Sequence, residues 1–406
     1  MGIGIHNFSE IGKLNKVLLH ELGSEIEALI PDNFERLLFD DIPYLTVARQ
    51  EHERFAQLLE ENGVEVVYYI SETAKALQDK SVRDAFTDRF IEESELTSER
   101  AKEAVKHYLD QMDTKEMVRT VIAGVKKADV EDLNSNSLAD YISRGYPYYT
   151  DPMPNLYFTR DPGACIGNGA NIHHMNTKAR RRESLLFDYI VRYNKDFAQE
   201  GSKLWYEYNQ EYAIEGGDIL VPSKDVVAIG LSARTTAVAI ERFAENILGQ
   251  STYKKVLVFD IPKCRAFMHL DTVFTMVDYD KFTIHPEIEG PLQVFEITLD
   301  ADGKARFSSR QEELVRILSS ELKIPSVELI RCGGDDRMAA QREQWNDGSN
   351  TLAIAPGVVV TYERNYVTND LLDKKGIEVL TMPSSELSRG RGGPRCMSCP
   401  VNREEI

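Results

Sequence analysis

The sequence predicts an α/β protein of repeated strand-rich units around a common centre, with a helical segment inserted after the first unit. One observation is a helix, glycine and strand pattern shared by residues 58–66 (LLEENGVEV) and 371–379 (LLDKKGIEV). Segments 243–259 and 314–330 again place an apolar helix before a strand. Any capped helix before a strand gives such a pattern, so the prediction depends on its recurrence. Units with several strands and one helix favour a radial assembly with its site where they meet.

The first unit begins with an apolar run over residues 14–22, which we expect to form a buried strand. A helix is predicted through residues 48–59, ending at Asn62-Gly63, where glycine can take the left-handed cap conformation. The following run, residues 64–70 (VEVVYYI), is rich in β-branched and aromatic residues and predicts the next strand.

Residues 71–148 differ from the rest because they are highly charged and almost free of strand-like runs. Amphipathic helices are predicted over 81–96 and 99–112, and a third begins at the N-cap Asp113 with Glu116 at the capping-box position. An apolar stripe on the third helix predicts core packing: Met117, Val118, Val121, Ile122 and Val125. We therefore expect a catalytic domain from residues 1–70 and 149–406 and an inserted helical bundle at 71–148, to which no chemistry is assigned.

Composition restricts the partners. The 406 residues include 48 Lys and Arg against 66 Asp and Glu, which gives a formal net charge of −18. Such a charge disfavours nucleic acid or an anionic membrane as the main partner. The sequence has no long apolar run and no signal-peptide pattern at its start, so we expect a soluble cytoplasmic protein.

The five cysteines, an odd number scattered along the chain, argue against a secreted disulfide framework. The spacing Cys396-x-x-Cys399 is also found in redox motifs and zinc sites. A redox motif needs a following helix, but Pro400 and six more residues end the sequence. A second pair of ligands at zinc-finger spacing is missing, and no metal site is predicted.

A glycine-rich basic loop, residues 389–400 (RGRGGPRCMSCP), delivers Cys396 near the end of an otherwise acidic sequence. Glycines let the backbone approach a ligand closely, and neighbouring arginines lower a thiol pKa by stabilising the thiolate. The loop therefore suits a nucleophile, although a flexible basic tail would have a similar composition.

Three carboxylates and a histidine are predicted at turns or strand ends. Asp161 follows an apolar segment, 155–158, that we expect to be a strand, and Glu215 precedes two glycines. His269 and Asp271 alternate in a presumed extended segment, which would place both on one face. Considered alone, a histidine in an apolar strand such as His269 is more often a core residue, and a basic run such as 178–183 is more often a solvated helix start.

Together these groups predict nucleophilic attack on a planar cation. Carboxylates match a guanidinium through paired charge-assisted hydrogen bonds. Cysteine supplies the nucleophile, and histidine can protonate a departing nitrogen and later deprotonate water. Arginines such as Arg180, Arg234 and Arg391 would hold a carboxylate at the other end of the substrate, which predicts an amino acid bearing a guanidinium.

The motifs resemble those of the arginine deiminase family, in the guanidine-modifying (pentein) superfamily, over nearly the whole chain. The matching segments are 37–41 (LLFDD), 158–161 (FTRD), 215–218 (EGGD), 268–274 (MHLDTVF), 342–345 (REQW) and 389–393 (RGRGG) leading to Cys396. The resemblance implies a five-bladed α/β propeller of ββαβ units, with a helical bundle inserted after the first and the active site on the pseudo-fivefold axis.

The resemblance also implies residue roles. Cys396 would attack the guanidinium carbon to form a covalent amidino-cysteine intermediate, and His269 would be the general acid and then the base that activates water. Asp161 and Asp271 would grip the guanidinium nitrogens, and Glu215 would support His269 and the substrate. The remaining substrate-binding residues implied are Asn155, Arg180, Arg234 and Arg391, with Leu38 and Gly390 in mobile loops.

The implied partners are L-arginine and water, without cofactor or metal, in a homodimer or homotetramer. The products would be L-citrulline and ammonia, in the first step of arginine catabolism. An amidinotransferase would use the same thiol but need an amine acceptor. An agmatine deiminase would lack the three arginines that bind the substrate carboxylate. A binding protein with a degenerate site is disfavoured because every catalytic position is filled, although a secondary binding role leaves little trace in a sequence. The sequence does not assign roles to Arg395, which would face the thiol or solvent, or to Cys399, which suits a small buried hydrophobe.

Overall fold

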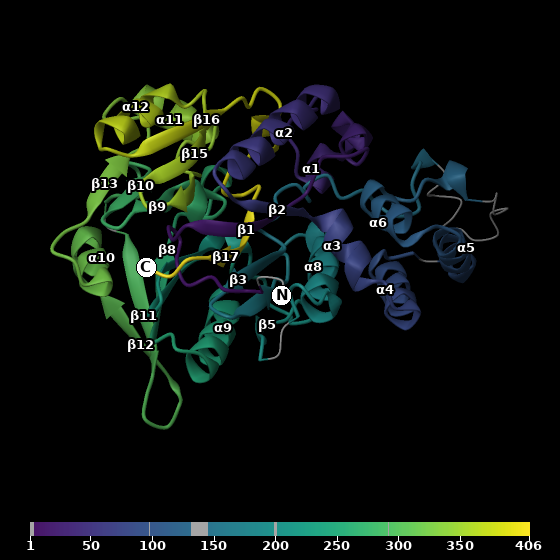
Figure 1. The fold of residues 1–406 in the computed structure, drawn as a ribbon, viewed down its shortest axis with the longest axis horizontal. Helices are drawn as coiled ribbons and strands as arrows, with labels where there is room; N and C mark the ends of the chain where they lie inside the picture. Colours follow the sequence, from purple (N-terminus) through teal and green to yellow (C-terminus); the bar gives the residue numbers. More distant parts are fainter. Residues whose placement is uncertain (1–3, 97, 131–144, 199–200, 291) are drawn as a thin grey trace.

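A computed structural model describes residues 4–96, 98–130, 145–198, 201–290 and 292–406. Its strands form five sheets (Figure 1), four with three strands and one with five. In every sheet one strand pairs antiparallel with a second, and the second pairs parallel with a third. The recurring arrangement confirms the predicted assembly of similar α/β units.

The first two strands of each unit form an antiparallel pair, and a helix connects the second strand to the third. The strands are β17 (Cys399–Arg403), β1 (Leu14–Leu19) and β2 (Glu65–Tyr68); β3 (Gly163–Ile166), β4 (Gly169–Ile172) and β5 (Lys203–Tyr206); β6 (Ile219–Ser223), β7 (Val226–Leu231) and β8 (Lys255–Asp260); β9 (Phe274–Asp278), β10 (Lys281–Ile284) and β13 (Glu328–Arg331); and β14 (Leu352–Ala355), β15 (Val358–Tyr362) and β16 (Glu378–Met382). The connecting helices are, in the same order, α2 (Leu45–Glu61), α8 (Arg181–Tyr193), α9 (Ala237–Gln250), α10 (Leu314–Leu322) and α12 (Tyr366–Lys374).

The two ends of the chain close this arrangement in a single sheet. β17 pairs antiparallel with β1, with Val17 opposite Pro400, and β1 pairs in parallel with β2. Because Cys396 lies just before β17, this pairing fixes the proposed nucleophile against the first unit of the chain. The glycine-rich segment is therefore part of the central fold and not a flexible tail.

A hairpin of β11 (Gln293–Leu299) and β12 (Ala305–Arg310) extends the third sheet and was not predicted. It lies between β10 and α10 in the chain, yet pairs with β8 of the preceding unit. Hydrophobic and polar residues alternate only weakly along this hairpin, because β12 is mostly exposed. Hydrophobic periodicity therefore gave little signal for it.

Helices dominate the described part of the segment between β2 and β3: α3 (Tyr69–Ala76), α4 (Lys80–Glu93), α5 (Glu99–Asp110) and α6 (Thr114–Ala123). Asp113 caps α6 by accepting a hydrogen bond from the Glu116 N–H at 2.9 Å. The apolar stripe of α6 is buried in a cluster that also contains Leu18 and Leu185 of the sheet-bearing part. The predicted division into two domains remains a prediction, since this core is continuous across the proposed boundary.

The structure corrects three local predictions. Residues 155–158 form a turn, because Leu156 and Phe158 N–H donate to the carbonyls three residues earlier, and the strand begins only at Gly163. β2 ends at Tyr68, and the fully buried Tyr69 begins helix α3. The strand predicted over residues 14–22 ends earlier, because β1 covers only Leu14–Leu19.

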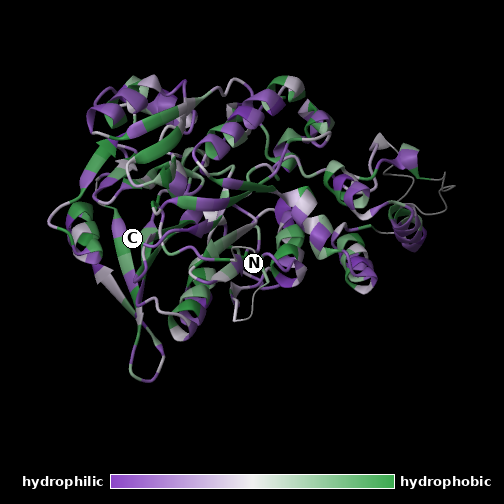
Figure 2. Cartoon of the chain, in the orientation of Figure 1, coloured by the Kyte–Doolittle hydropathy of each residue, from purple (hydrophilic) through white to green (hydrophobic). Residues whose placement is uncertain are grey.

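Hydropathy follows the architecture. Figure 2 shows hydrophobic residues along the central strands and hydrophilic residues over much of the outer helices. The glycine at the end of α2 has φ +80° and that after α12 has φ +79°, so both helices of the sequence repeat end as predicted. Among the described residues, no helix has both the length and the apolar character required to cross a membrane.

Candidate active site

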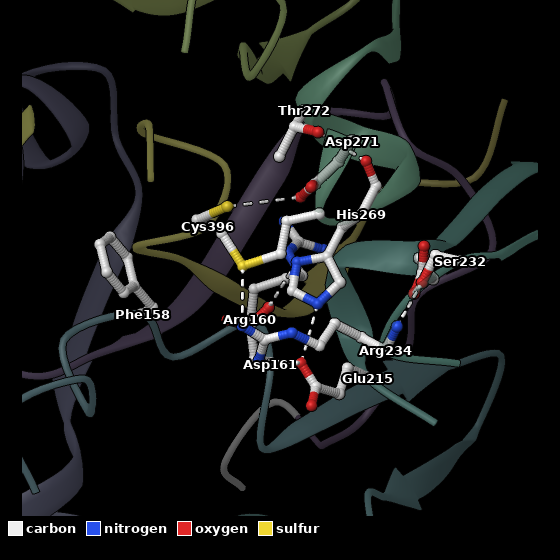
Figure 3. Close-up of polar contacts among 12 residues, drawn as sticks. Phe158, Arg160, Asp161, Glu215, Ser232, Arg234, His269, Asp271, Thr272 and Cys396 are labelled. Atoms are coloured by element: carbon white, nitrogen blue, oxygen red, sulfur yellow. Dashed lines mark hydrogen bonds and ion pairs between the residues drawn. The ribbon is translucent and has the colours of Figure 1, made fainter. Parts of the chain in front are cut away.

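A pocket of about 230 Å³ lies where segments from several units meet. Nine of the eleven predicted site residues line it: Leu38, Asn155, Asp161, Arg180, Arg234, His269, Gly390, Arg391 and Cys396. The other two contact lining residues, since Glu215 bonds His269 and Asp271 bonds Cys396 (Figure 3). Segments up to 358 residues apart in sequence thus form one site.

Cys396 is held by backbone and side-chain contacts before β17 begins. Its N–H donates to Asn350 Oδ1 at 2.9 Å, and its thiol donates to Asp271 Oδ2 at 3.6 Å. Asn350 Nδ2 in turn donates to the Asp271 carbonyl at 3.1 Å. One buried amide therefore fixes the relative positions of the thiol and the carboxylate.

His269 lies between two carboxylates. Its Nε2 is 2.8 Å from Glu215 Oε2, and its Nδ1 is 3.9 Å from Asp161 Oδ1. Burial lowers the pKa of His269, but Asp161, the hydrogen bond to Glu215 and Asp218 outweigh burial and raise it to about 9. The ring is therefore an imidazolium at neutral pH, with Nε2–H donating to Glu215 and Nδ1–H facing Asp161.

The segment that carries His269 is not extended, which corrects the alternation argument. Leu270–Thr272 form a 3₁₀ turn, and the Leu270 N–H donates to Asp218 Oδ1 at 2.9 Å. Asp218 also accepts from Ser232 and Thr235 hydroxyls at 2.7 and 2.6 Å. The imidazole and the Asp271 carboxylate reach one site because this turn is anchored, not because of strand geometry.

Asp161 and Asp271 each have one oxygen engaged and one without a partner. Asp161 Oδ2 accepts from Arg180 at 2.6 Å, and Asp271 Oδ2 accepts from Arg395 at 2.7 Å. Within the described residues, both Oδ1 atoms are buried and lack a hydrogen-bond partner. A buried carboxylate oxygen without a donor is costly, so these two atoms favour a ligand that supplies N–H groups.

Burial raises the pKa of the Cys396 thiol well above its usual value, and Asp271, Asp161 and Asp347 raise it further. Arg395 lowers it, but by less. The expectation that flanking arginines activate the thiol is therefore wrong for the ligand-free site. A cation between the carboxylates would cancel the negative charge that favours the protonated thiol.

Arg395 neither faces the solvent nor contacts the thiol. It is almost completely buried and donates to Asp271 Oδ2 at 2.7 Å, to Glu10 Oε1 at 3.1 Å and to the Ile219 carbonyl at 2.8 Å. Burial raises the pKa of Glu10, but Arg395 and the nearby Arg160 outweigh it and lower the value to about 2. A buried Glu10–Arg395–Asp271 ion-pair chain thus stands behind the pocket.

The three predicted substrate-binding arginines have different surroundings. Arg180 is buried and bonded to Asp161 and, at 2.9 Å, to Glu183. Arg234 is partly exposed, 3.6 Å from Glu215 Oε2 and 3.2 Å from the Met268 sulfur. Arg391 has its guanidinium 3.3 Å from the centre of the Trp345 ring. All three bring positive charge to the pocket.

Backbone conformation shapes the two predicted loops. Leu38 has φ +64° and ends the short helix α1 (Phe34–Leu37), and Arg391 has φ +65° after a 3₁₀ turn at Leu387–Gly390. A Cβ on Gly390 would lie 1.7 Å from Tyr157 Oη, so only glycine fits there without a shift. Asn155 Nδ2 donates to the Leu37 carbonyl at 2.7 Å and links the first loop to the pocket.

Other residues complete the pocket but had been given no role: Phe158, Ala233, Cys264, Met268 and Thr272. Phe158, Met268 and Thr272 lie within the motifs 158–161 and 268–274, so the sequence carried a usable signal for them. Asn350 and Glu10 gave none, because an amide or a carboxylate remote in sequence becomes important only through the fold. Cys399 is buried, and its thiol is 3.5 Å from the Gly163 carbonyl, as expected for a small core residue.

The five-sheet α/β fold, a pocket lined by a thiol and an imidazolium, and two buried carboxylate oxygens without partners among the described residues define an enzyme of the guanidine-modifying pentein class. The profile of the family described as arginine deiminase matches residues 35–403. The chain belongs to the arginine deiminase family, which confirms the resemblance and the implied enzyme class, a hydrolase acting on the guanidino C–N bond of arginine.

Similar curated proteins named arginine deiminase include one from Bacillus thuringiensis subsp. konkukian, 50% identical over 406 residues and 99% of each chain. Another, from Clostridium perfringens, is 52% identical over 404 residues and 98% of each chain. Among solved structures, an amidinotransferase from Microseira wollei is similar with a TM-score of 0.56 at 14% identity, covering 99% of this chain and 98% of that one. The inosamine-phosphate amidinotransferase of Streptomyces griseus has a TM-score of 0.53 at 13% identity, with 99% and 97% covered. The structural likenesses support the fold alone.

Proposed function

We propose that the protein hydrolyses L-arginine to L-citrulline and ammonia with Cys396 as nucleophile. The observation that carries the proposal is the pair of buried, partnerless Oδ1 atoms of Asp161 and Asp271 beside the thiol. A guanidinium would give both oxygens N–H donors and place its central carbon near the sulfur. Membership of the arginine deiminase family supports the same substrate.

Substrate binding itself prepares the nucleophile. A guanidinium neutralises the two carboxylates that raise the pKa of the Cys396 thiol. The thiol then loses its proton to solvent, and the thiolate sulfur forms a bond to the guanidinium carbon. The resulting tetrahedral adduct is neutral, and both carboxylates remain hydrogen-bonded to its nitrogens.

His269 acts next as general acid. Its Nδ1–H, on the pocket side of the ring, protonates a terminal nitrogen, the C–N bond breaks, and ammonia leaves. The product on the enzyme is an amidino-cysteine thioether. Glu215 keeps Nε2–H bonded throughout, so the neutral ring retains its orientation with a free Nδ1 lone pair.

The neutral imidazole then serves as the base for hydrolysis. Nδ1 takes a proton from a water molecule that enters the place of ammonia, and the hydroxide attacks the amidino carbon. The C–S bond breaks, the thiolate leaves, and the remaining hydroxyl proton passes to solvent, which gives citrulline; the ammonia released earlier takes up a proton there to become ammonium. His269 is again an imidazolium for the next turnover.

We assign recognition of the amino-acid end to the cationic side of the pocket. Arg234 and Arg391, together with Asn155, would bind the α-carboxylate and α-amino groups, while Arg180 adds charge and fixes Asp161. Leu38 and Gly390 lie in the adjoining loops and would pack over the ligand. Agmatine lacks the carboxylate, so it would leave these arginines unmatched.

The test of this proposal is an assay of purified protein with L-arginine and with agmatine, scoring citrulline and ammonia, alongside Cys396→Ala. Equal amounts of both products from arginine, none from agmatine and none from the variant would support hydrolysis. Citrulline-free turnover that needs an added amine would instead identify an amidinotransferase. Folded protein without any turnover of arginine would contradict the proposal.

A homodimer or homotetramer and a cytoplasmic location are the accompanying expectations. Light scattering of the purified protein measures the first, and fractionation of cells that express it measures the second. Neither enters the chemistry proposed above, because every group used there comes from a single chain.

A further inference from the structure

We propose that a second cavity, distinct from the active site, binds a small phosphate-bearing molecule. Its volume is about 1030 Å³, and it lies between helix α4 with its following loop and the segment that leads into α8. None of its described lining residues also lines the active-site pocket. We call it the α4–α8 cavity.

The lining is locally basic in a strongly acidic protein. Six Lys or Arg side chains line it against four carboxylates, whereas the whole chain has an excess of acidic residues. The basic residues are Arg36, Arg89, Lys127, Lys178, Arg181 and Arg182. The acidic residues are Glu92, Glu93, Glu95 and Asp151. Such a local reversal of charge favours an anionic ligand.

Arg182 is the decisive cation. Only 5% of it is exposed, and it donates to the Asp151 carbonyl at 2.8 Å and to Ser94 Oγ at 3.4 Å, with its guanidinium over the Phe90 ring. In the described chain no carboxylate lies within ion-pair distance of it. The hydrogen-bond partners of Arg182 are neutral, and the nearby carboxylates of Asp151, Glu183 and Glu93 act on it only from beyond ion-pair distance, so a bound anion would stabilise this buried charge further.

The side chain of the neighbouring Arg181 is exposed and forms no hydrogen bond or ion pair with the described residues, while its backbone N–H donates to the Lys178 carbonyl. It is the first residue of helix α8, whose 13 residues place a positive dipole end at the cavity. The N-cap, Arg180, accepts no capping hydrogen bond from the helix backbone, although its guanidinium donates to Glu183 in the first turn. An arginine pair at such a helix start suits a phosphate group.

An independent observation comes from His173, which is fully buried and lines the cavity. Its Nδ1 is 2.5 Å from the Asp161 carbonyl, and burial lowers its pKa to about 4, so the neutral ring donates through Nδ1. Nε2 is then an acceptor, and among the described residues it has no partner. A ligand that also carries a hydroxyl or a protonated phosphate oxygen would satisfy it.

The remaining wall suits an organic portion. Tyr146, Tyr148, Tyr149 and Tyr208 contribute aromatic faces with polar ends, and the volume is several times what inorganic phosphate requires. The phosphate could belong to the free ion or to an organic phosphate. The arginines would bind the phosphate group in both cases, whereas only an organic phosphate would also contact the tyrosines.

The α4–α8 cavity shares its wall with the active site, and this part of the inference rests on the proposed function. Arg36 lines the cavity while Leu38 lines the pocket, and Arg181 lines the cavity while Arg180 lines the pocket. His173 holds the backbone carbonyl of Asp161 itself. Occupancy would therefore alter the KM for arginine through these segments.

Titration calorimetry of the full chain tests binding without reference to activity. The probes are inorganic phosphate, ribose 5-phosphate, adenosine 5′-monophosphate and adenosine, with chloride at matched ionic strength. We expect the phosphate-bearing probes to bind and adenosine and chloride not to bind. Equal affinity for phosphate and the organic phosphates would identify the free ion, and tighter organic binding would identify an organic phosphate.

The variant Arg181→Gln should weaken phosphate binding at least about tenfold, because it removes a charge-assisted contact. Arg119→Gln, an exposed arginine of α6 outside the cavity, is the matched control and should bind as the wild type does. No binding by any phosphate-bearing probe, or equal binding by Arg181→Gln and wild type, would overturn the site. Probe binding with an unchanged KM for arginine would overturn only the coupling.

Discussion

Arg395 places its guanidinium 2.7 Å from Asp271, and both side chains are almost completely buried behind the nucleophile. This ion pair holds one Asp271 oxygen, and the other is buried without a hydrogen-bond partner among the described residues. Arg395 is itself held by Glu10, which is more than 380 residues away in sequence. The orientation of Asp271, the proposed guanidinium-binding carboxylate, thus depends on the segment that precedes β1.

Replacing Glu10 by Gln should destabilise the protein by about 3–5 kcal/mol, because it leaves Arg395 among other buried arginines with less compensation. Urea unfolding at pH 7 measures this loss. Glu312→Gln, which removes an exposed partner of Arg310, is the control and should leave the unfolding midpoint unchanged. Equal midpoints for Glu10→Gln and wild type would show that the ion-pair chain does not stabilise the fold.

The same carboxylate predicts a dependence of stability on acid. The pKa of Glu10 is lowered from 4.5 to about 2 in the folded state, so its contribution is present above pH 4.5 and is lost as pH falls toward 2. The contribution is roughly 3 kcal/mol. Unfolding free energies measured at pH 5 and pH 3 should fall less for Glu10→Gln than for wild type. Parallel losses in both proteins would contradict this assignment.

The imidazolium of His269 predicts a limit at high pH. The pKa of His269 is raised from 6.5 to about 9. The protonated ring, which is the acid needed for ammonia release, is therefore lost as pH rises through about 9. Its contribution to the stability of the fold is fully present below pH 6.5 and is lost over the same rise. We expect kcat/KM for arginine to fall above about pH 9. Glu215→Gln should move the fall to lower pH by roughly 1 to 3 units. An unmoved profile would show that Glu215 does not tune this group.

Asp271→Asn should make the thiol more reactive while it impairs catalysis. The charge of Asp271 raises the pKa of the Cys396 thiol, so its removal lowers that pKa. Each unit by which the pKa falls increases the thiolate fraction about tenfold. Rates of iodoacetamide alkylation without substrate measure the effect, in a Cys264→Ser background that removes the exposed thiol. Slower alkylation than in the same background with Asp271 intact would contradict it.

Trp345 should contribute to substrate binding through Arg391. The ring is about half exposed, and a cation–π contact of this kind contributes roughly 0.5–1 kcal/mol. Trp345→Leu is therefore expected to raise the KM for arginine about 2- to 5-fold with little change in kcat. Met338→Leu, at an exposed position of the same helix, is the control. A fall in kcat with unchanged KM would show that the Trp345–Arg391 contact does not contribute to substrate binding.

Much of the fold and most of the candidate site could be predicted from the sequence, because the site residues belong to short motifs that lie in anchored turns. The repeat pattern identified the units, and the glycines after α2 and α12 take the φ values it implied. The extended conformation predicted for 269–271 was wrong, since Asp218, not strand geometry, fixes that turn. Thiol activation by flanking arginines was also wrong: Arg395 turns to Asp271 and Glu10, an outcome that spacing cannot reveal.

Asn350 is the clearest example of a site residue that the sequence alone does not identify. A single amide between an aspartate-bearing turn and the nucleophile has no periodicity, no charge and no local motif, yet it bonds both. Only the fold brings the segment before β14 against the segment before β17. Residues of this kind become visible when the backbone donors and acceptors of the site are followed to their partners.

The central claim is the covalent role of Cys396, and acid quenching during turnover followed by intact-protein mass spectrometry tests it most directly. With arginine as substrate, we predict a protein species heavier by the mass of arginine less that of ammonia, located by peptide mapping to Cys396 and absent from Cys396→Ala. An adduct on any other residue, or steady production of citrulline by Cys396→Ala, would contradict the mechanism.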